Sequence, residues 1–126
     1  MMSQDDQFVW IFPKEKSFAY QSYPEYLEHN GKWIIYGGKS LIENLGYKML
    51  TLVGEDGILQ AKFTRNPALK VPDGYERGVH ALIVYCDDRN NDSVKRKLKD
   101  RLGVDKMIWK YDKETIQEIL NSKVHD

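Results

Sequence analysis

The chain has little cysteine, no long apolar run and no excess of either charge. Its single cysteine among 126 residues has no partner for an internal disulfide, and three scattered histidines do not complete a structural zinc site around it. No stretch approaches the roughly 18 apolar residues of a membrane-spanning helix. The first residues are acidic and polar, unlike a signal peptide, so we expect a cytoplasmic protein with no membrane contact, no bound metal and no cofactor.

Basic and acidic residues balance, 19 against 19, so the formal net charge is zero. This excludes the bulk basicity that drives non-specific binding to nucleic acid, and any anion-binding surface has to be a local patch. Hydrophobic residues make up 41% of the chain, which is enough to bury a core at this length. We therefore expect residues 1–126 to form a single domain.

A largely apolar run from Val79 to Tyr85, followed by a turn rich in Asp and Asn, is the expected centre of a sheet. Apolar residues occupy both parities of this run, which predicts a strand covered on both faces. Residues 58–64 alternate between apolar and polar instead, which predicts one core face and one polar face. Shorter strands are expected at 32–36 and 107–111, and another at 8–12 that suits a sheet edge.

Helices are expected between these strands. Ser40 and Glu43 fit a capping box, and the apolar stripe behind them predicts a helix that runs to Val53. A second helix, with a basic outer face, is expected at 92–102, and a third from Asp112 onward. A short helical turn at 24–31 and a long loop at 65–78 complete the chain. The order predicts an α+β domain with a mainly antiparallel sheet and helices packed on one face.

Cationic side chains fall on the expected polar face of the sheet. Lys62 lies there and Arg65 follows it, while Lys32, His80 and Lys110 can join them by strand parity. Converging cations would bind a phosphate or carboxylate through charge-assisted hydrogen bonds that contribute about 1.5–3 kcal/mol each. The alternative is a set of ordinary solvated lysines, because parity does not tell which strands are neighbours.

Histidine and tryptophan residues on the expected strands also have two interpretations. His80 is either a hydrogen-bonded core residue or a group that titrates near neutral pH in a site. Trp10, Trp33 and Trp109 either pack in the core or stack a nucleotide or a base of single-stranded nucleic acid. Acidic residues dilute the basic helix at 92–102, so its support for nucleic-acid binding is weak. Cys86 has no identifiable activating base and is interpreted as structural.

Four segments, taken in order, carry a family resemblance. They are Gly31-Lys32-Trp33-Ile34-Ile35-Tyr36, then Gly57-Ile58-Leu59-Gln60-Ala61-Lys62-Phe63-Thr64, then Ala81-Leu82-Ile83-Val84-Tyr85 with its Asp-rich turn and basic helix, and finally Trp109-Lys110-Tyr111-Asp112 with Thr115. In this order and spacing the chain resembles the basophilic-leukaemia-expressed protein family over roughly residues 30 to 120.

This resemblance implies an α+β fold similar to that of the cap-binding translation initiation factor, with a curved antiparallel sheet backed by helices. Some archaeal members of the family are described as phosphothreonine lyases, β-eliminating enzymes in which a lysine removes the Cα proton and a histidine protonates the leaving phosphate. On this sequence the resemblance would make Lys62 the base and His80 the acid, with Arg65 and Lys110 as the phosphate clamp.

Three functions stay open at this point. Recognition of a phosphorylated peptide or nucleotide, with or without lyase activity, requires the cations to share one pocket, with Lys32, Trp33 and Trp109 as further contacts. A non-catalytic module for nucleotide or single-stranded nucleic acid requires an exposed tryptophan beside the cations. An interaction domain requires a flat face with dispersed lysines. We favour phosphate recognition, while the ligand, the catalysis and the oligomeric state are open.

Overall fold

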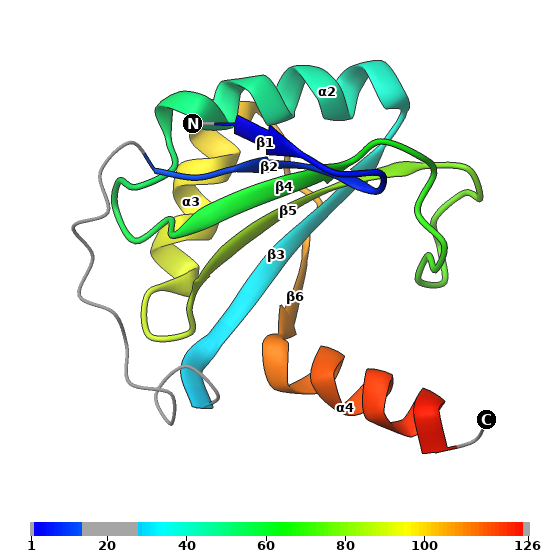
Figure 1. Ribbon diagram of the computed structural model, residues 1–126. Helices are drawn as coiled ribbons and strands as arrows, with labels where there is room; N and C mark the ends of the chain where they lie inside the picture. Colours follow the sequence, from blue (N-terminus) through cyan, green and yellow to red (C-terminus); the bar gives the residue numbers. More distant parts are fainter. Residues whose placement is uncertain (1, 14–27, 125–126) are drawn as a thin grey trace.

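The computed structural model describes residues 2–13 and 28–124, which form an antiparallel sheet of six strands with helices on both sides (Figure 1). The strand order is β1-β2-β4-β5-β3-β6. The strands are β1 (Met2–Gln4), β2 (Phe8–Ile11), β3 (Asn30–Gly37), β4 (Gln60–Thr64), β5 (His80–Asp87) and β6 (Ile108–Tyr111). The predicted α+β class and antiparallel sheet are confirmed.

Strand β5 is central, as the sequence predicts, because it pairs with β3 along one side and β4 along the other. Seven of its eight residues are buried, so both faces are covered over most of its length. The expectation of an edge strand at 8–12 is wrong, since β1 pairs along the outer side of β2 and aligns Met2 with Ile11. All three residues of β1 are exposed, which explains why no apolar pattern marks this strand.

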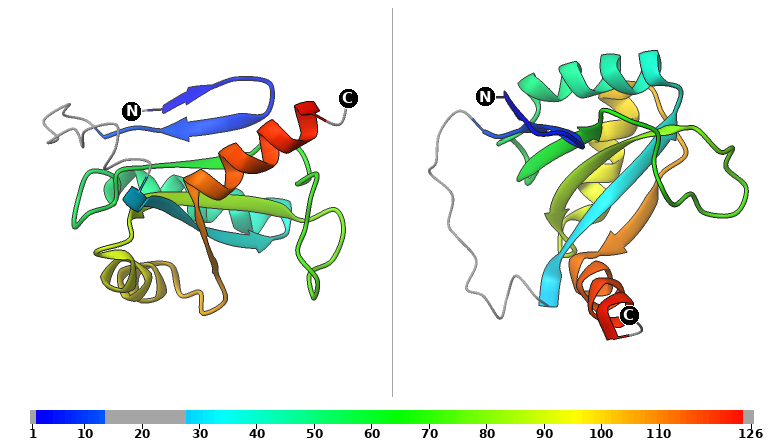
Figure 2. Two further views of the ribbon diagram at one scale, coloured as in Figure 1. Left: turned by 90° about the horizontal axis from the view of Figure 1, so that it is seen from below. Right: turned by 45° about the vertical axis from the view of Figure 1, so that its right-hand side comes forward.

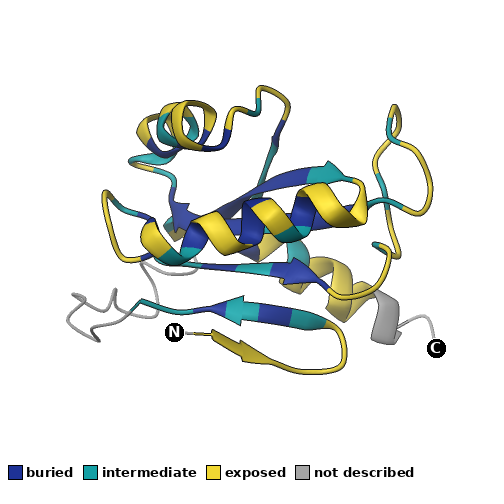
Figure 3. Cartoon of the chain, turned by 90° about the horizontal axis from the view of Figure 1, so that it is seen from above, coloured by how far each residue is buried: buried dark blue, intermediate teal, exposed yellow. Residues whose placement is uncertain are grey.

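Helices α2 (Lys39–Lys48) and α3 (Asn91–Leu102) cover one face of the sheet, and the short 3-10 helix η1 (Met49–Thr51) continues α2. The inner side of α2 is buried and its outer side exposed (Figure 3). The buried stripes of these helices meet alternate residues of the strands in one apolar core. Its fully buried members include Ile42, Met49, Leu82, Val84, Val94 and Leu98.

The start of α2 differs from the capping box that the sequence predicts. The helix begins at Lys39 and its N-cap is Gly38, so Ser40 already lies within the first turn. No side chain of the described residues donates to or accepts from this cap. The predicted end of α3 is confirmed, because Gly103 caps the helix in the left-handed region, with φ of 69°.

Helix α4 (Asp112–Val124) lies on the other face of the sheet (Figure 2). The expectation of helices on one face therefore holds for α2 and α3 and is wrong for α4. Its apolar side chains Ile116, Ile119 and Leu120 are 40–52% exposed, so they add little to the core. The helical turn expected at 24–31 lies largely outside the described residues. None of the described helices is long and apolar enough to cross a membrane.

Candidate functional site

The face of the sheet opposite α2 and α3, called the open face below, carries three lysines from three strands. The register aligns Lys32 of β3 with Lys110 of β6 and with Tyr85 of β5. Lys62 of β4 is aligned with Ile83, two residues before Tyr85 on the same face. The strand parity thus gathers these three predicted cations on one face.

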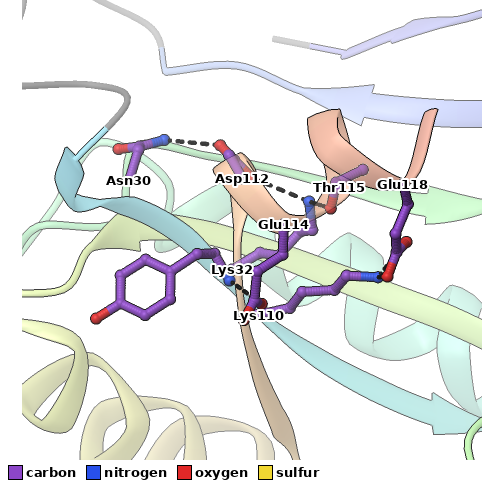
Figure 4. Close-up of polar contacts among 8 residues, drawn as sticks. Asn30, Lys32, Lys110, Asp112, Glu114, Thr115 and Glu118 are labelled. Carbon is purple, nitrogen blue, oxygen red and sulfur yellow. Dashed lines mark hydrogen bonds and ion pairs between the residues drawn. The ribbon is translucent and has the colours of Figure 1, made fainter. Parts of the chain in front are cut away.

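Two of these lysines are tied to α4 (Figure 4). Lys32 Nζ donates to Asp112 Oδ1 at 2.9 Å and to Thr115 Oγ1 at 2.7 Å, and both charged side chains are less than 10% exposed. Lys110 Nζ donates to both carboxylate oxygens of Glu118, at 2.9 and 2.8 Å. This hydrogen bond lowers the pKa of Glu118, against a smaller effect of desolvation. Both ammonium groups therefore already have acidic partners.

Lys62 lies in a different environment, on aromatic rings. Its Nζ is 3.9 Å from the ring centroid of Phe8, 4.5 Å from that of Trp10 and 5.9 Å from that of Tyr85. Within residues 2–13 and 28–124, this amine has no hydrogen bond and no ion pair. Desolvation lowers the pKa of Lys62, and the nearby charge of Lys32 lowers it further, while Asp112 and Asp5 act in the opposite direction.

A pocket of about 410 Å³ opens on the same face between the strands and the loop at 65–79. This volume falls in the range of small-ligand sites. The lining is largely apolar, and Lys70 supplies a cation from the loop. Lys62 is not one of the lining residues, but two residues that line the pocket are its neighbours: Phe8, on whose ring its Nζ lies, and its strand partner Ile83. The members that the sheet contributes are Phe8, Ile34, Tyr36, Thr64, Ala81 and Ile83.

The predicted acid, His80, does not lie with Lys62. It is 5% exposed and has the opposite strand parity to Ile83 and Tyr85. Its Nδ1 is 3.2 Å from Thr64 Oγ1, which also accepts a hydrogen bond from the backbone amide of Ala81. His80 is therefore a buried, hydrogen-bonded residue, in line with the core interpretation.

Arg65 also stays outside the group of open-face cations. Its side chain is exposed, and its Nη1 donates to the backbone carbonyl of Asp5 at 2.6 Å. This contact holds the guanidinium over the turn between β1 and β2. The structure thus brings together Lys32, Lys62 and Lys110 and places Arg65 and His80 elsewhere.

The three tryptophans, all within the described residues, divide between the two faces. Trp33 and Trp109 pack edge to face at 5.3 Å on the core side, where Trp33 Nε1 donates to the carbonyl of Asn91 at 2.9 Å. Only Trp10 is on the open face, half-buried and parallel to Phe12, with Nε1 3.1 Å from Asp5 Oδ2. The predicted contacts Trp33 and Trp109 are therefore core residues.

Phe8, Tyr36 and Lys70 were not singled out by the sequence. Phe8 could have been found from the parity of its strand, because it shares a face with Trp10 two residues on. Lys70 lies in a loop, where no periodicity assigns a direction to a side chain.

A second polar cluster lies at the opposite end of β5 and consists of His29, Asp87 and Asp88, whose ligand atoms lie within 4.8 Å of one another. Asp88 bonds His29 Nδ1 and the hydroxyl of Tyr111, each at 2.9 Å. Asp87 binds the guanidinium of Arg89 through both oxygens, and this hydrogen bond lowers its pKa. We assign no metal here, because both carboxylates are engaged by protein donors.

Neither the comparison with protein-family models nor the comparison with curated proteins gives a match for this chain. The fold and the site thus define the class of protein, an α+β domain with lysines, aromatic rings and an apolar pocket on one sheet face. The family resemblance of the four segments stays a prediction.

Proposed function

We propose that the chain is a recognition domain for a phosphorylated small ligand, which lies on the open face with its anionic group within reach of Lys62 and Lys70 and its apolar part in the pocket. The observation that carries this proposal is the position of Lys62 Nζ, half removed from water on two aromatic rings and without an acidic partner among the described residues. Such an ammonium gains about 1.5–3 kcal/mol from a hydrogen bond to an anion.

The lining of the pocket supports a ligand with a flat apolar group, such as a nucleotide. Phe8 and Tyr36 contribute aromatic rings to the lining, and Ile34 and Ile83 contribute aliphatic side chains. A zero net charge argues against a long nucleic-acid strand, whose binding relies on many phosphate contacts. A mononucleotide needs only the local cations that this face provides.

Recognition without catalysis is the form of this proposal that the geometry supports. A β-elimination needs a proton acceptor and a proton donor on the same bound ligand. Lys62 lies next to residues that line the pocket, whereas His80 is buried and bonded to Thr64. The two residues that the family resemblance makes base and acid therefore do not face one ligand.

The family resemblance contributes to the proposal at the level of the fold. We propose that the sheet, backed by α2 and α3, is an arrangement similar to that of the cap-binding initiation factor. An antiparallel sheet with β5 at its centre supports this relation. Membership in the basophilic-leukaemia-expressed protein family is part of the same proposal.

Titration with adenosine monophosphate, monitored by tryptophan fluorescence and thermal shift, tests the function. Trp10 is the tryptophan beside the site, so Trp10→Phe should remove the fluorescence change and keep the thermal shift. Lys62→Ala should weaken binding by roughly tenfold or more, since it removes a charge-assisted bond. The matched control is Lys99→Ala, because Lys99 is exposed on α3, on the other face.

Inorganic phosphate, a phosphothreonine peptide and a short single-stranded RNA complete the titration. Unchanged binding of the nucleotide by Lys62→Ala, or no binding by the unmodified chain, would overturn the proposal. Loss of phosphate from the peptide, seen by mass spectrometry and absent in Lys62→Ala, would restore the lyase interpretation.

A further inference from the structure

We propose that Lys62 is an imine-forming amine, and that the ligands of this site include phosphorylated aldehydes or ketones that bind it covalently and reversibly. This inference rests on the proposed recognition of phospho-ligands and adds the chemistry of the reacting group. Its geometric basis is a nucleophilic side chain whose Nζ lies 3.9 Å from the ring centroid of Phe8, a residue that lines a pocket of about 410 Å³.

The contrast among the three open-face lysines identifies Lys62. Ion pairing favours the ammonium form, which has no lone pair, and therefore opposes attack on a carbonyl. Lys32 is paired with Asp112 and Lys110 with Glu118. Lys62 Nζ is held on the rings of β2 without such a partner within the described residues.

The charged and titratable groups around Lys62 come from four elements. Lys32 of β3 disfavours its ammonium form, whereas Asp5 before β2 and Asp112 of α4 favour it, and Tyr85 of β5 places its ring 5.9 Å away. Contact with aromatic faces also stabilises the cation. Desolvation is the largest of the effects of burial and charge, and with Lys32 it lowers the pKa of Lys62 against Asp112 and Asp5, which increases the neutral, nucleophilic fraction of the amine.

The reaction is a condensation that needs no oxidant or reductant. The lone pair of Nζ attacks the carbonyl carbon, a C–N bond forms, and the carbonyl oxygen takes up a proton. Loss of the second amine proton and of this hydroxyl as water leaves a C=N bond. The phosphate of the ligand then lies toward Lys70, the lysine that lines the pocket.

Pyridoxal 5′-phosphate is a suitable probe, because it combines an aldehyde, a flat ring and a phosphate. We expect an imine absorption band on mixing and, after reduction with borohydride, a single adduct at Lys62 by peptide mass spectrometry. Pyridoxal, which lacks the phosphate, should label Lys62 far less. Lys62→Arg should lose the adduct, because a guanidinium forms no imine under these conditions, and Lys99→Ala, on the other face, should change neither the adduct nor adenosine monophosphate binding.

Two outcomes would overturn this inference. Adducts spread over the exposed lysines would show that Lys62 has no special reactivity. Equal labelling by pyridoxal would show a reactive amine without selection for phosphate. Adenosine monophosphate, which has no aldehyde or ketone, separates a failure of recognition from a failure of the covalent step. If it neither binds nor protects Lys62 from labelling, the proposed recognition fails. If it binds but pyridoxal 5′-phosphate forms no imine with Lys62, only the covalent step is contradicted.

Discussion

At the scale of single residues, the close approach of α2 to β4 depends on one glycine. A Cβ atom added to Gly46 would lie 2.3 Å from Cδ1 of Phe63, whose ring also packs edge to face on Tyr47. The apolar pattern of the helix gives no reason for a glycine inside it, where glycine is less favourable than alanine by about 1 kcal/mol. The reason is the space that the Phe63 ring occupies.

Gly46→Ala should therefore destabilise the protein despite the better helix propensity of alanine. We expect the free energy of unfolding to fall by about 1–3 kcal/mol, the usual cost of overpacking a core. Urea denaturation measures the change. The control is Asn44→Ala, because Asn44 is exposed on the same helix, where alanine improves the helix propensity without entering the core. Equal stability of the two variants would refute the packing argument.

The ion pair between Lys32 and Asp112 is the second feature of this scale, and its side chains are 9% and 7% exposed. Asp112→Ala removes the partner and leaves a buried ammonium, which should cost about 3–5 kcal/mol of unfolding free energy. Replacing both partners, as Lys32→Met with Asp112→Leu, should restore most of the loss in a denaturant titration. A double variant as unstable as the single one would show that packing around Asp112, and not charge, sets the cost.

Cys86 gives a prediction that depends on pH. Burial, aided by the charges of Asp87, Asp112 and Asp88, raises the pKa of this thiol to about 12. A raised pKa in the folded state means that this contribution to stability is present below the ordinary value of 9.0 and is lost as the pH rises through about 12. At pH 8 we expect no reaction of the native thiol with a disulfide reagent and rapid reaction in urea; fast native labelling would contradict the burial.

At the scale of elements, α4 is attached to the open face mainly by polar contacts. Lys32 and Lys110 hold its first two turns through Asp112, Thr115 and Glu118. The apolar side chains of the helix stay partly exposed, so burial does little to fix it on the sheet. The helix should therefore open more readily than α2 or α3.

Acidification should loosen α4 before it affects the core. The pKa of Glu118 is lowered by its bond to Lys110, so this contribution is present above the ordinary value of 4.5 and is lost as the pH falls through the lowered one. Below pH 4.5, amide hydrogen exchange should show lower protection factors in α4, while those of α2 stay high. In Glu118→Gln the protection factors of the α4 amides should already be lower at neutral pH and should vary less with pH. An unchanged pH profile of these protection factors would show that the ion pair between Lys110 and Glu118 does not anchor the helix.

The elements also show what the sequence could predict. Alternation and apolar runs found β4, β5 and the two helices behind the sheet, because these elements have a buried side that marks their period. The edge strand β1 has no buried side that would mark it. The capping box was wrong because the helix already begins after Gly38, so that Ser40 lies inside its first turn and is not the N-cap. Helical periodicity could not say on which face α4 would lie.

Parity also limits the predicted site. Lys32 and Trp33 are neighbours in one strand, so they cannot both face a ligand on the same side of the sheet, and the same holds for Trp109 and Lys110. His80 shares its parity with Leu82 of the core. Strand parity thus places the lysines on the open face and Trp33, Trp109 and His80 on the core face. The pocket itself depends on the loop at 65–79, whose course no periodicity predicts.

At the scale of the whole molecule, one face of the sheet carries the core and the other carries the proposed binding site. Helices α2 and α3 lie on one face and α4 on the other (Figure 2). The first face contains the apolar core, and the second contains the lysines and the pocket. A neutral chain can in this way present local positive charge without a basic surface overall. The stability variants of the core and the binding variants of the open face should accordingly be separable.

The pairing of β3 also affects how the chain can fold while it is being synthesised. Both neighbours of this strand, β5 and β6, lie after it in the chain, at residues 80–87 and 108–111. During synthesis Trp33 and Ile35 are thus added to the chain about fifty residues before Val84 and Leu82, their partners in β5, and longer before β6. The nascent chain therefore contains this apolar strand without its neighbours over that interval, and we expect it to be most prone to aggregation before β5 has been added.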